Sequence, residues 1–99
     1  MSKVTFVSRM TVKEGREAEF VERCNRLHAA VKQSEPETLY YEFFKLREPQ
    51  RYCVIESFAN AAAEEAHMSS PLLVEHGPGI VDCLAEPYVR EYLDPFEVP

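Results

Sequence analysis

The chain has 99 residues, 45% of them apolar and 28% charged, a profile that predicts one soluble globular domain with its own core and leaves no room for two domains. Seventeen acidic against eleven basic side chains give a net charge of -6, which disfavours nucleic acid and anionic membranes as partners. No apolar run approaches the roughly 20 residues that cross a bilayer, and the first residues lack a signal peptide's small-residue cleavage site, so we expect a cytoplasmic protein.

β-Forming side chains predict a first strand over residues 3–12, which ends before Gly15. In residues 14–32 the apolar positions recur at spacings of four, three and four, which predicts a helix with a single apolar stripe that covers a sheet. Pro36 ends this helix. The stripe consists of Phe20, Cys24, Leu27 and Val31.

Residues 38–46 carry large apolar side chains on both parities, as is typical of a strand covered on both faces. A turn at 47–51 leads into a third strand at 51–59, and we expect the two strands to pair as a hairpin. Glu56 lies on the same parity as the apolar residues of the third strand. If that face is buried, its carboxylate needs a partner.

Asn60 is a suitable cap for a helix over the segment AAAEEAH, and Ser70-Pro71 for a second helical segment over 71–86. We expect Gly77-Pro78-Gly79 to interrupt or kink that segment. The fourth strand is predicted at 86–93, and residues 94–99 are predicted to form an extended tail.

The order β-α-β-β-α-β over residues 4–93 predicts an α+β domain of the ferredoxin-like class, with helices on one face of a four-stranded antiparallel sheet. The other face of such a sheet is bare. Since the second strand has apolar side chains on both parities, we expect a second copy to cover that face and form a homodimer.

Four segments, in this order and spacing, resemble a known family. They are TVKEGREAEF at the first helix, SEPETLYYE at the second strand, REPQRYCVIESF at the hairpin, and AAAEEAHMSSP. The chain is similar to the antibiotic biosynthesis monooxygenase (ABM) family. The resemblance implies a dimeric α+β barrel that oxidises a small quinol, phenol or polyketide-type aromatic with dioxygen and without a cofactor. This sequence departs from the family at Leu72 and Leu73, where members often have a histidine and an aromatic residue, and at Phe58, where tryptophan is frequent.

His67 is the first candidate for the catalytic base, because a histidine with a pKa near neutral can take a phenolic proton. The alternative is a helix residue hydrogen-bonded near the Ser69-Ser70 break. Glu56 either orients this histidine or pairs with an arginine.

Further candidates for substrate binding or support each have a structural alternative. Tyr41 and Tyr52 can donate hydrogen bonds to a substrate oxygen, or serve as core residues. Arg9 is a salt-bridge partner for Glu56 or stabilises an anion. His76 points into the substrate cavity expected at His67, or only interacts with a helix C-terminus.

No cofactor or metal is expected. His67, His76 and Glu56 match no ligand spacing, and GxGxxG, P-loop and GxSxG motifs are missing from the sequence. The three cysteines form no Cys-x-x-Cys pair and are expected to be reduced and buried. They are Cys24, Cys53 and Cys83.

Two other functions stay open. An isomerase resembling the autoinducer-2 phosphate processing members needs a compact cationic site, for which few basic residues are available. A non-catalytic dimeric barrel that binds a small hydrophobic ligand is favoured by the missing second histidine.

Overall fold

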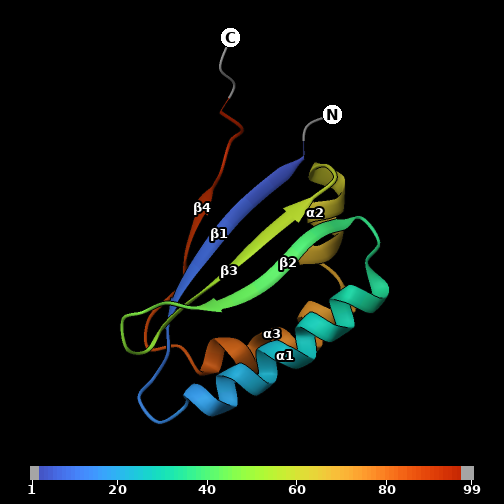
Figure 1. Ribbon diagram of the computed structural model, residues 1–99. Coiled ribbons are helices and arrows are strands. Elements are labelled where there is room, and N and C mark those ends of the chain that lie inside the picture. Colours follow the sequence, from blue (N-terminus) through green and yellow to red (C-terminus); the bar gives the residue numbers. More distant parts are fainter. Residues whose placement is uncertain (1–2, 97–99) are drawn as a thin grey trace.

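The computed structural model describes residues 3–96 and shows a four-stranded antiparallel sheet with its helices on one side (Figure 1). The elements follow the order β-α-β-β-α-α-β, so the ferredoxin-like α+β prediction is confirmed and its second helix is divided in two. The strands are β1 (Val4–Thr11), β2 (Thr38–Lys45), β3 (Arg51–Phe58) and β4 (Val89–Tyr92). The helices are α1 (Glu17–Ser34), α2 (Ala61–Met68) and α3 (Pro71–Asp82).

The sheet has the strand order β2-β3-β1-β4, and its register decides which side chains share the helix-covered face. Glu56 of β3 lies opposite Tyr41 on one neighbouring strand and opposite Phe6 on the other. Because cross-strand partners project to the same face, these pairs form rows of side chains beneath the helices. One row is Tyr41, Glu56, Phe6 and Tyr92, and the next is Phe43, Val54, Ser8 and Arg90.

The core lies between this face and the helices. All four residues of the predicted α1 stripe are buried, which agrees with the spacing of apolar positions in the sequence. They pack against the apolar side chains of β1, β3 and α3 in one continuous cluster, while Phe6 and Phe58 form a smaller cluster under α2. The helix stripe and the alternation of the strands therefore specify the same buried layer.

The start of each short helix is capped as the sequence predicts. The Asn60 side chain accepts a hydrogen bond from the Ala63 N–H over 2.8 Å, and the Ser70 hydroxyl accepts one from the Leu73 N–H over 3.4 Å. Pro71 occupies the first turn of α3, where its missing N–H has no consequence. These caps place His67 in the last turn of α2, directly above the sheet.

The expected break at Gly77-Pro78-Gly79 does not interrupt α3, which continues to Asp82. Pro78 has no N–H to donate to the carbonyl of Val74, four residues earlier in the helix. Because Val74 is 72% exposed, water can hydrate that carbonyl instead. A Cβ at Gly79 would meet the far end of the Arg23 side chain of α1, which would have to move.

The ends of the last elements also differ from the prediction. α3 ends at Asp82 because the chain then turns to bond back to β1, where the Ala85 N–H donates to the Thr11 carbonyl over 2.7 Å. β4 is consequently short and begins at Val89. Residues 94–96 are neither helix nor strand, and the rest of the predicted tail lies outside the described residues.

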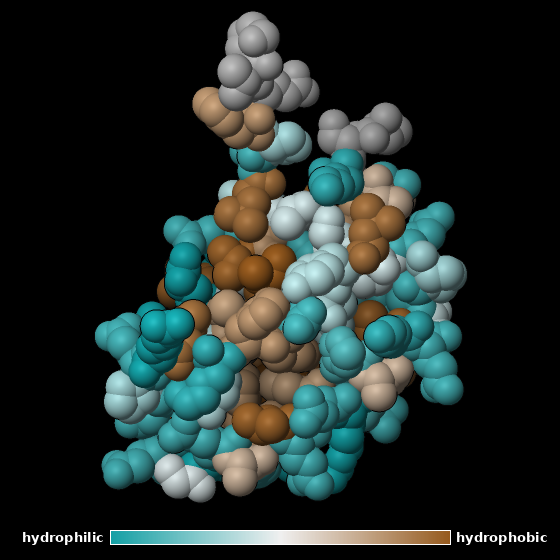
Figure 2. Space-filling model, viewed as in Figure 1, coloured by the Kyte–Doolittle hydropathy of each residue, from teal (hydrophilic) through white to brown (hydrophobic). Residues whose placement is uncertain are grey.

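The face of the sheet opposite the helices has no helix or strand over it among residues 3–96 (Figure 1). Apolar atoms gather over the middle of the molecule in this view, with hydrophilic atoms around them (Figure 2). Val89 is 58% exposed and Tyr40 is 43% exposed on this side. Within 3–96, no helix combines the length and the apolar character that a membrane crossing requires.

Candidate functional site

A cavity of about 150 Å³, here called the inner cavity, lies between the helix-covered face of the sheet and helices α2 and α3. Its wall is mainly apolar and includes Leu27, Phe43 and Ile80. The polar side chains on it are few and project from separate elements of the fold. They are Ser8, Tyr41, Glu56, His67, Tyr88 and Arg90.

His67 is the most buried of these polar groups, with 2% of the residue exposed, and a carboxylate lies at each of its ring nitrogens. Nδ1 lies 2.6 Å from Oε1 of Glu35, a short hydrogen bond. Nε2 lies 3.3 Å from Oε1 of Glu56, within ion-pair distance but without hydrogen-bond alignment, so this oxygen has no hydrogen-bond partner among the described residues. Of the two partners that the sequence predicts for Glu56, a histidine or an arginine, the structure brings the histidine next to it; that Glu56 orients this histidine stays a prediction.

The two carboxylates control the protonation of His67. Burial lowers the pKa of a histidine, but Glu56 and Glu35 outweigh it here, and the net pKa of His67 is raised above its ordinary 6.5. A histidine in a cavity wall whose pKa is shifted by burial and by specific charged partners is a candidate functional residue.

Glu35 was not among the site residues predicted from the sequence. It is the residue at which α1 ends, and its side chain reaches His67 across 32 positions of sequence. One signal in the sequence could have indicated it: a glutamate next to the helix-ending Pro36 places a negative charge at the negative end of the helix dipole. That placement is unfavourable unless a buried cation compensates it.

Aromatic rings fix the His67 ring from the other directions. Tyr41 contacts it edge-on, with the ring centroids 5.3 Å apart, and the Phe58 ring lies 5.1 Å away. His28 stacks on the far side of Tyr41 at 6.1 Å. Burial, followed by the nearby Glu56, raises the pKa of the Tyr41 hydroxyl far above its ordinary value, so this tyrosine stays neutral.

Arg90 brings a cation to the inner cavity. Its Nε donates to the Ser8 hydroxyl over 3.1 Å, and its guanidinium lies 4.1 Å from the centre of the Phe6 ring. None of the ion pairs formed by the described residues includes Arg90, so its charge is available to an anion in the cavity. The sequence analysis did not select this residue, because its relation to Ser8 depends on the pairing of β4 with β1.

Three predicted supporting residues are not brought to the cavity. Tyr52 lies on the correct face but farther along β3, where its hydroxyl donates to Glu17 over 2.7 Å. Arg9 projects from the opposite face and pairs with Glu91 at 3.1 Å, so it is not the partner of Glu56. His76 lies on α3 near Glu75, at 4.0 Å, and is not part of the cavity wall.

The arrangement can move a proton and hold an anion. Glu56 and His67 supply a proton-accepting pair, and Arg90 with Ser8 supplies a positive charge and a hydroxyl. In residues 3–96 no group of three His, Cys, Asp or Glu side chains is arranged to hold a metal ion.

Comparisons with known proteins agree with this fold. A candidate antibiotic biosynthesis monooxygenase from Caulobacter crescentus CB15 is 29% identical, with a TM-score of 0.91 over 97% of this chain and 92% of that one. A conserved protein from Methanosarcina mazei Go1 shares the fold at 20% identity, with a TM-score of 0.86 over 94% of this chain and 92% of its own. A Mycobacterium tuberculosis protein does so at 14% identity and a TM-score of 0.87, over 98% of each chain.

Among curated proteins no significant match is found. The family model for antibiotic biosynthesis monooxygenases matches residues 4–76, a segment that contains Glu35, Glu56 and His67. The match covers well over half of the 99 residues and agrees with the resemblance read from the sequence. The chain therefore belongs to the antibiotic biosynthesis monooxygenase family.

Proposed function

We propose that this protein is a cofactor-independent monooxygenase that oxidises a small quinol or phenol with dioxygen, using Glu56 and His67 to take the hydroxyl proton. One observation carries the proposal: a buried pair of proton-accepting groups, 3.3 Å apart, lies in the wall of a mainly apolar cavity. Family membership supports the same class of reaction.

The proposed reaction begins with the substrate hydroxyl at Glu56. This carboxylate, which stands on the sheet beside the cavity, takes the proton and passes it to Nε2 of His67, which is neutral at a pH above its raised pKa. The products of this step are a substrate anion, an ionised Glu56 and an imidazolium. Hydrogen bonds of this kind are often long in a ligand-free site and tighten when substrate binds, which accommodates the 3.3 Å separation.

The resulting anion is electron-rich enough to react with dioxygen, and the guanidinium of Arg90 stabilises its negative charge. A quinol and one dioxygen give a hydroxyquinone and one water. The quinol itself supplies all the electrons for this change, so the balance needs no external reductant. The proton held by His67 returns to the oxygen that leaves as water.

The inner cavity also indicates the size of the substrate. A dry apolar cavity near 150 Å³ is known to hold a single benzene ring, and the inner cavity has about that volume. A one-ring quinol or phenol therefore matches its volume. Because Val81 and Tyr88 on its wall are 54% and 46% exposed, a fused polyketide-type aromatic would extend from the cavity into solvent.

The two other functions considered from the sequence receive different support. Arg90 is the only Lys or Arg among the described residues of the cavity wall, which is a poor match for a phosphorylated sugar. A non-catalytic binder of a small hydrophobic ligand would use the same apolar wall but would not depend on His67 for turnover.

We further propose that the protein is a cytoplasmic homodimer. The support for dimerisation is the uncovered sheet face, where Val89 and Tyr40 are exposed. The support for the cytoplasm is that Cys24, Cys53 and Cys83 are all unpaired thiols. Sedimentation at micromolar concentration tests the dimer, and a monomer would contradict it.

Oxygen uptake tests the function. Wild type, His67→Gln and the matched control His76→Gln are incubated with a panel of one-ring quinols, in air and under nitrogen. We expect uptake above the spontaneous rate for wild type and His76→Gln, and a loss of roughly 100-fold in His67→Gln. Uptake equal in all three, or uptake of no quinol, would contradict oxygenation. Equal affinity of wild type and His67→Gln for a quinol, without turnover by either protein, would identify a non-catalytic binder.

A further inference from the structure

We propose that Glu35 is a positioning residue of this site: it holds His67 in the tautomer with hydrogen on Nδ1 and so makes Nε2, beside Glu56, the atom that accepts the proton. This inference deepens the proposed function and rests on it. Glu35 itself does not line the inner cavity and acts only through the imidazole ring.

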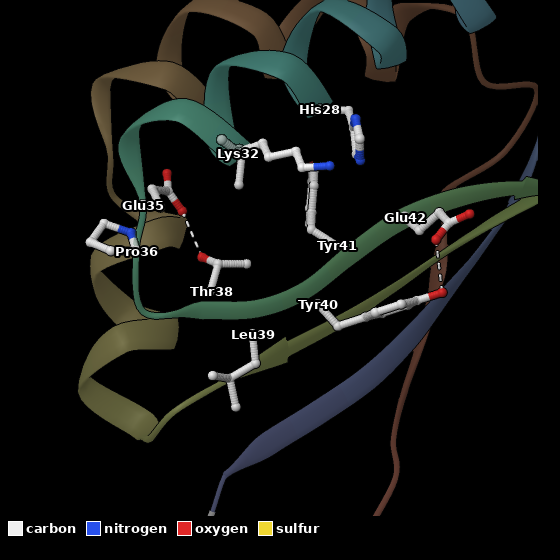
Figure 3. A pocket seen from close by; sticks show the side chains of 10 residues that line it. His28, Lys32, Glu35, Pro36, Thr38, Leu39, Tyr40, Tyr41 and Glu42 are labelled. Carbon is white, nitrogen blue, oxygen red and sulfur yellow. Dashed lines mark hydrogen bonds between the residues drawn. The ribbon is translucent and has the colours of Figure 1, made fainter.

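The contacts of Glu35 show that its carboxylate is held in place for this bond. Oε1 accepts from His67 Nδ1 over 2.6 Å and from the Thr38 hydroxyl over 3.1 Å. The Thr38 N–H also donates to the Glu35 carbonyl over 3.1 Å, which closes a turn between α1 and β2. Figure 3 shows this carboxylate pointing toward Thr38 at the end of α1.

The ring makes a hydrogen bond to Glu35 but only a longer, unaligned contact with Glu56, and this difference selects the tautomer. A neutral imidazole has one N–H and one lone pair. Because the contact of Nδ1 with Glu35 is the short and aligned one, the hydrogen of the neutral ring resides there, and the lone pair is on Nε2. The proton-accepting atom therefore faces the side of the ring on which Glu56 stands.

The position of Glu35 is costly without such a role. It ends α1, where the helix dipole disfavours a negative charge, and its side chain is mostly buried. Its Oε2 has no hydrogen-bond partner among the described residues. A carboxylate in this setting needs a strong compensating contact, and His67 provides the only ion pair that Glu35 makes within residues 3–96.

The groups around the ring agree with this division of roles. The titratable groups that face His67 are Glu35 from the end of α1, Glu56 from β3 and Tyr41 from β2, while Arg90 of β4 lines the same cavity. Tyr41 stays neutral, so among these groups only the two glutamates raise the pKa of His67 against the lowering effect of its burial. Glu56 adjoins the inner cavity, whereas Glu35 adjoins a groove of about 380 Å³ on the outer surface.

The proton transfer then balances as follows. At a pH above the pKa of His67 the ring is neutral before reaction, with Nδ1–H donated to the Glu35 carboxylate and Nε2 bare. The substrate O–H bond breaks, its proton reaches Nε2 by way of Glu56, and the electron pair stays on the substrate oxygen. Glu35 keeps its charge throughout and stabilises the imidazolium, as the carboxylate behind a catalytic histidine does in other enzymes.

The test replaces Glu35 by Gln and by Asp, with Glu37→Gln as the matched control. Glu37 lies two residues away, is exposed, and makes no side-chain contact with His67. Nitrogen NMR of the His67 ring reports its tautomer and titration, and the pH profile of kcat is recorded with the best quinol. Backbone NMR spectra verify that each variant is folded.

We expect Glu37→Gln to match wild type in every measurement. In Glu35→Gln the preference for Nδ1–H should be lost and the His67 titration should move to lower pH, because a carboxylate that favours the imidazolium is gone. The acid limb of the pH profile of kcat should move to lower pH together with the His67 titration. In the same variant, kcat at its plateau should fall roughly 100-fold while KM changes little. Glu35→Asp should recover part of the lost rate.

Two results separate this inference from the proposed function. An unchanged tautomer and titration of His67 in Glu35→Gln would overturn the role of Glu35, whatever the activity. If the tautomer of His67 changes in Glu35→Gln but the wild-type protein oxygenates no quinol, the proposed function is overturned, whereas the role of Glu35 in fixing the tautomer of His67 is supported.

Discussion

Below the raised pKa of His67, replacing this residue by Ala should destabilise the protein strongly, because it leaves two carboxylates without their cation. The side chains of His67, Glu56 and Glu35 are 1%, 5% and 16% exposed, so water cannot compensate the loss. Unit charges near 4 Å interact by about 4 kcal/mol at an effective dielectric constant of about 20. Breaking a buried pair costs about 3–5 kcal/mol in measured cases, a large part of the ~5–15 kcal/mol that holds a domain together.

Urea unfolding at two pH values checks this magnitude and its origin. The first measurement is made at about pH 6, where carboxylates are ionised. There, a loss of about 3 kcal/mol or more in the free energy of unfolding should lower the urea concentration at the unfolding midpoint by at least ~1 M, because this free energy falls by about 1–3 kcal/mol per M of urea. At about pH 4 the deficit should shrink, because acid neutralises carboxylates. Adding Glu56→Gln to His67→Ala should restore part of the stability. A deficit below ~1 kcal/mol, or one independent of both pH and Glu56, would refute the reasoning.

Three further predictions concern other parts of the molecule. The pKa of His67 in the folded protein is raised above 6.5, so its stabilising contribution is complete below about pH 6.5 and is lost as the pH rises through the pKa of the folded state. The difference in unfolding free energy between wild type and His67→Gln should therefore narrow over that rise in pH, as urea unfolding at several pH values would show. Burial raises the pKa of Cys24 to about 12, so this thiol should resist alkylation at about pH 8 until urea is added, as mass spectrometry of the labelled protein would show. Gly77→Ala should stabilise α3 by up to ~1 kcal/mol, because the added Cβ meets only Leu73 Cδ1 at 4.0 Å. Gly79→Ala should be stabilised less, because the Arg23 side chain must move. Thermal unfolding of the two variants compares these effects.

The features that depend on neighbouring residues in sequence were predictable. The α1 stripe and the Asn60 and Ser70 caps follow from helical periodicity and from side chains that bond the backbone three residues on. The alternation of β3 also predicted that Glu56 would need a partner if its face were buried, and this face is buried. The continuity of α3 through Pro78 was not predictable in this way, since it depends on which side of the helix faces water.

The partners within the site were harder to predict because they depend on register and on contacts distant in sequence. Glu35 meets His67 across 32 positions, through a helix end whose direction no local pattern determines. Arg9 falls on the wrong face by one position of strand parity. Tyr52 is on the correct face, yet it lies four residues along β3 from Glu56 and therefore contacts the start of α1 instead.

The most direct test of the proposed function follows the oxygen atoms. Wild type and His67→Gln are given the best quinol under isotopically labelled dioxygen, and the product is analysed by mass spectrometry. The proposal predicts one labelled oxygen atom in the hydroxyquinone formed by wild type, with water as the only other product and a rate that depends on His67. An unlabelled quinone with released peroxide, or labelling that is as fast in His67→Gln as in wild type, would contradict it.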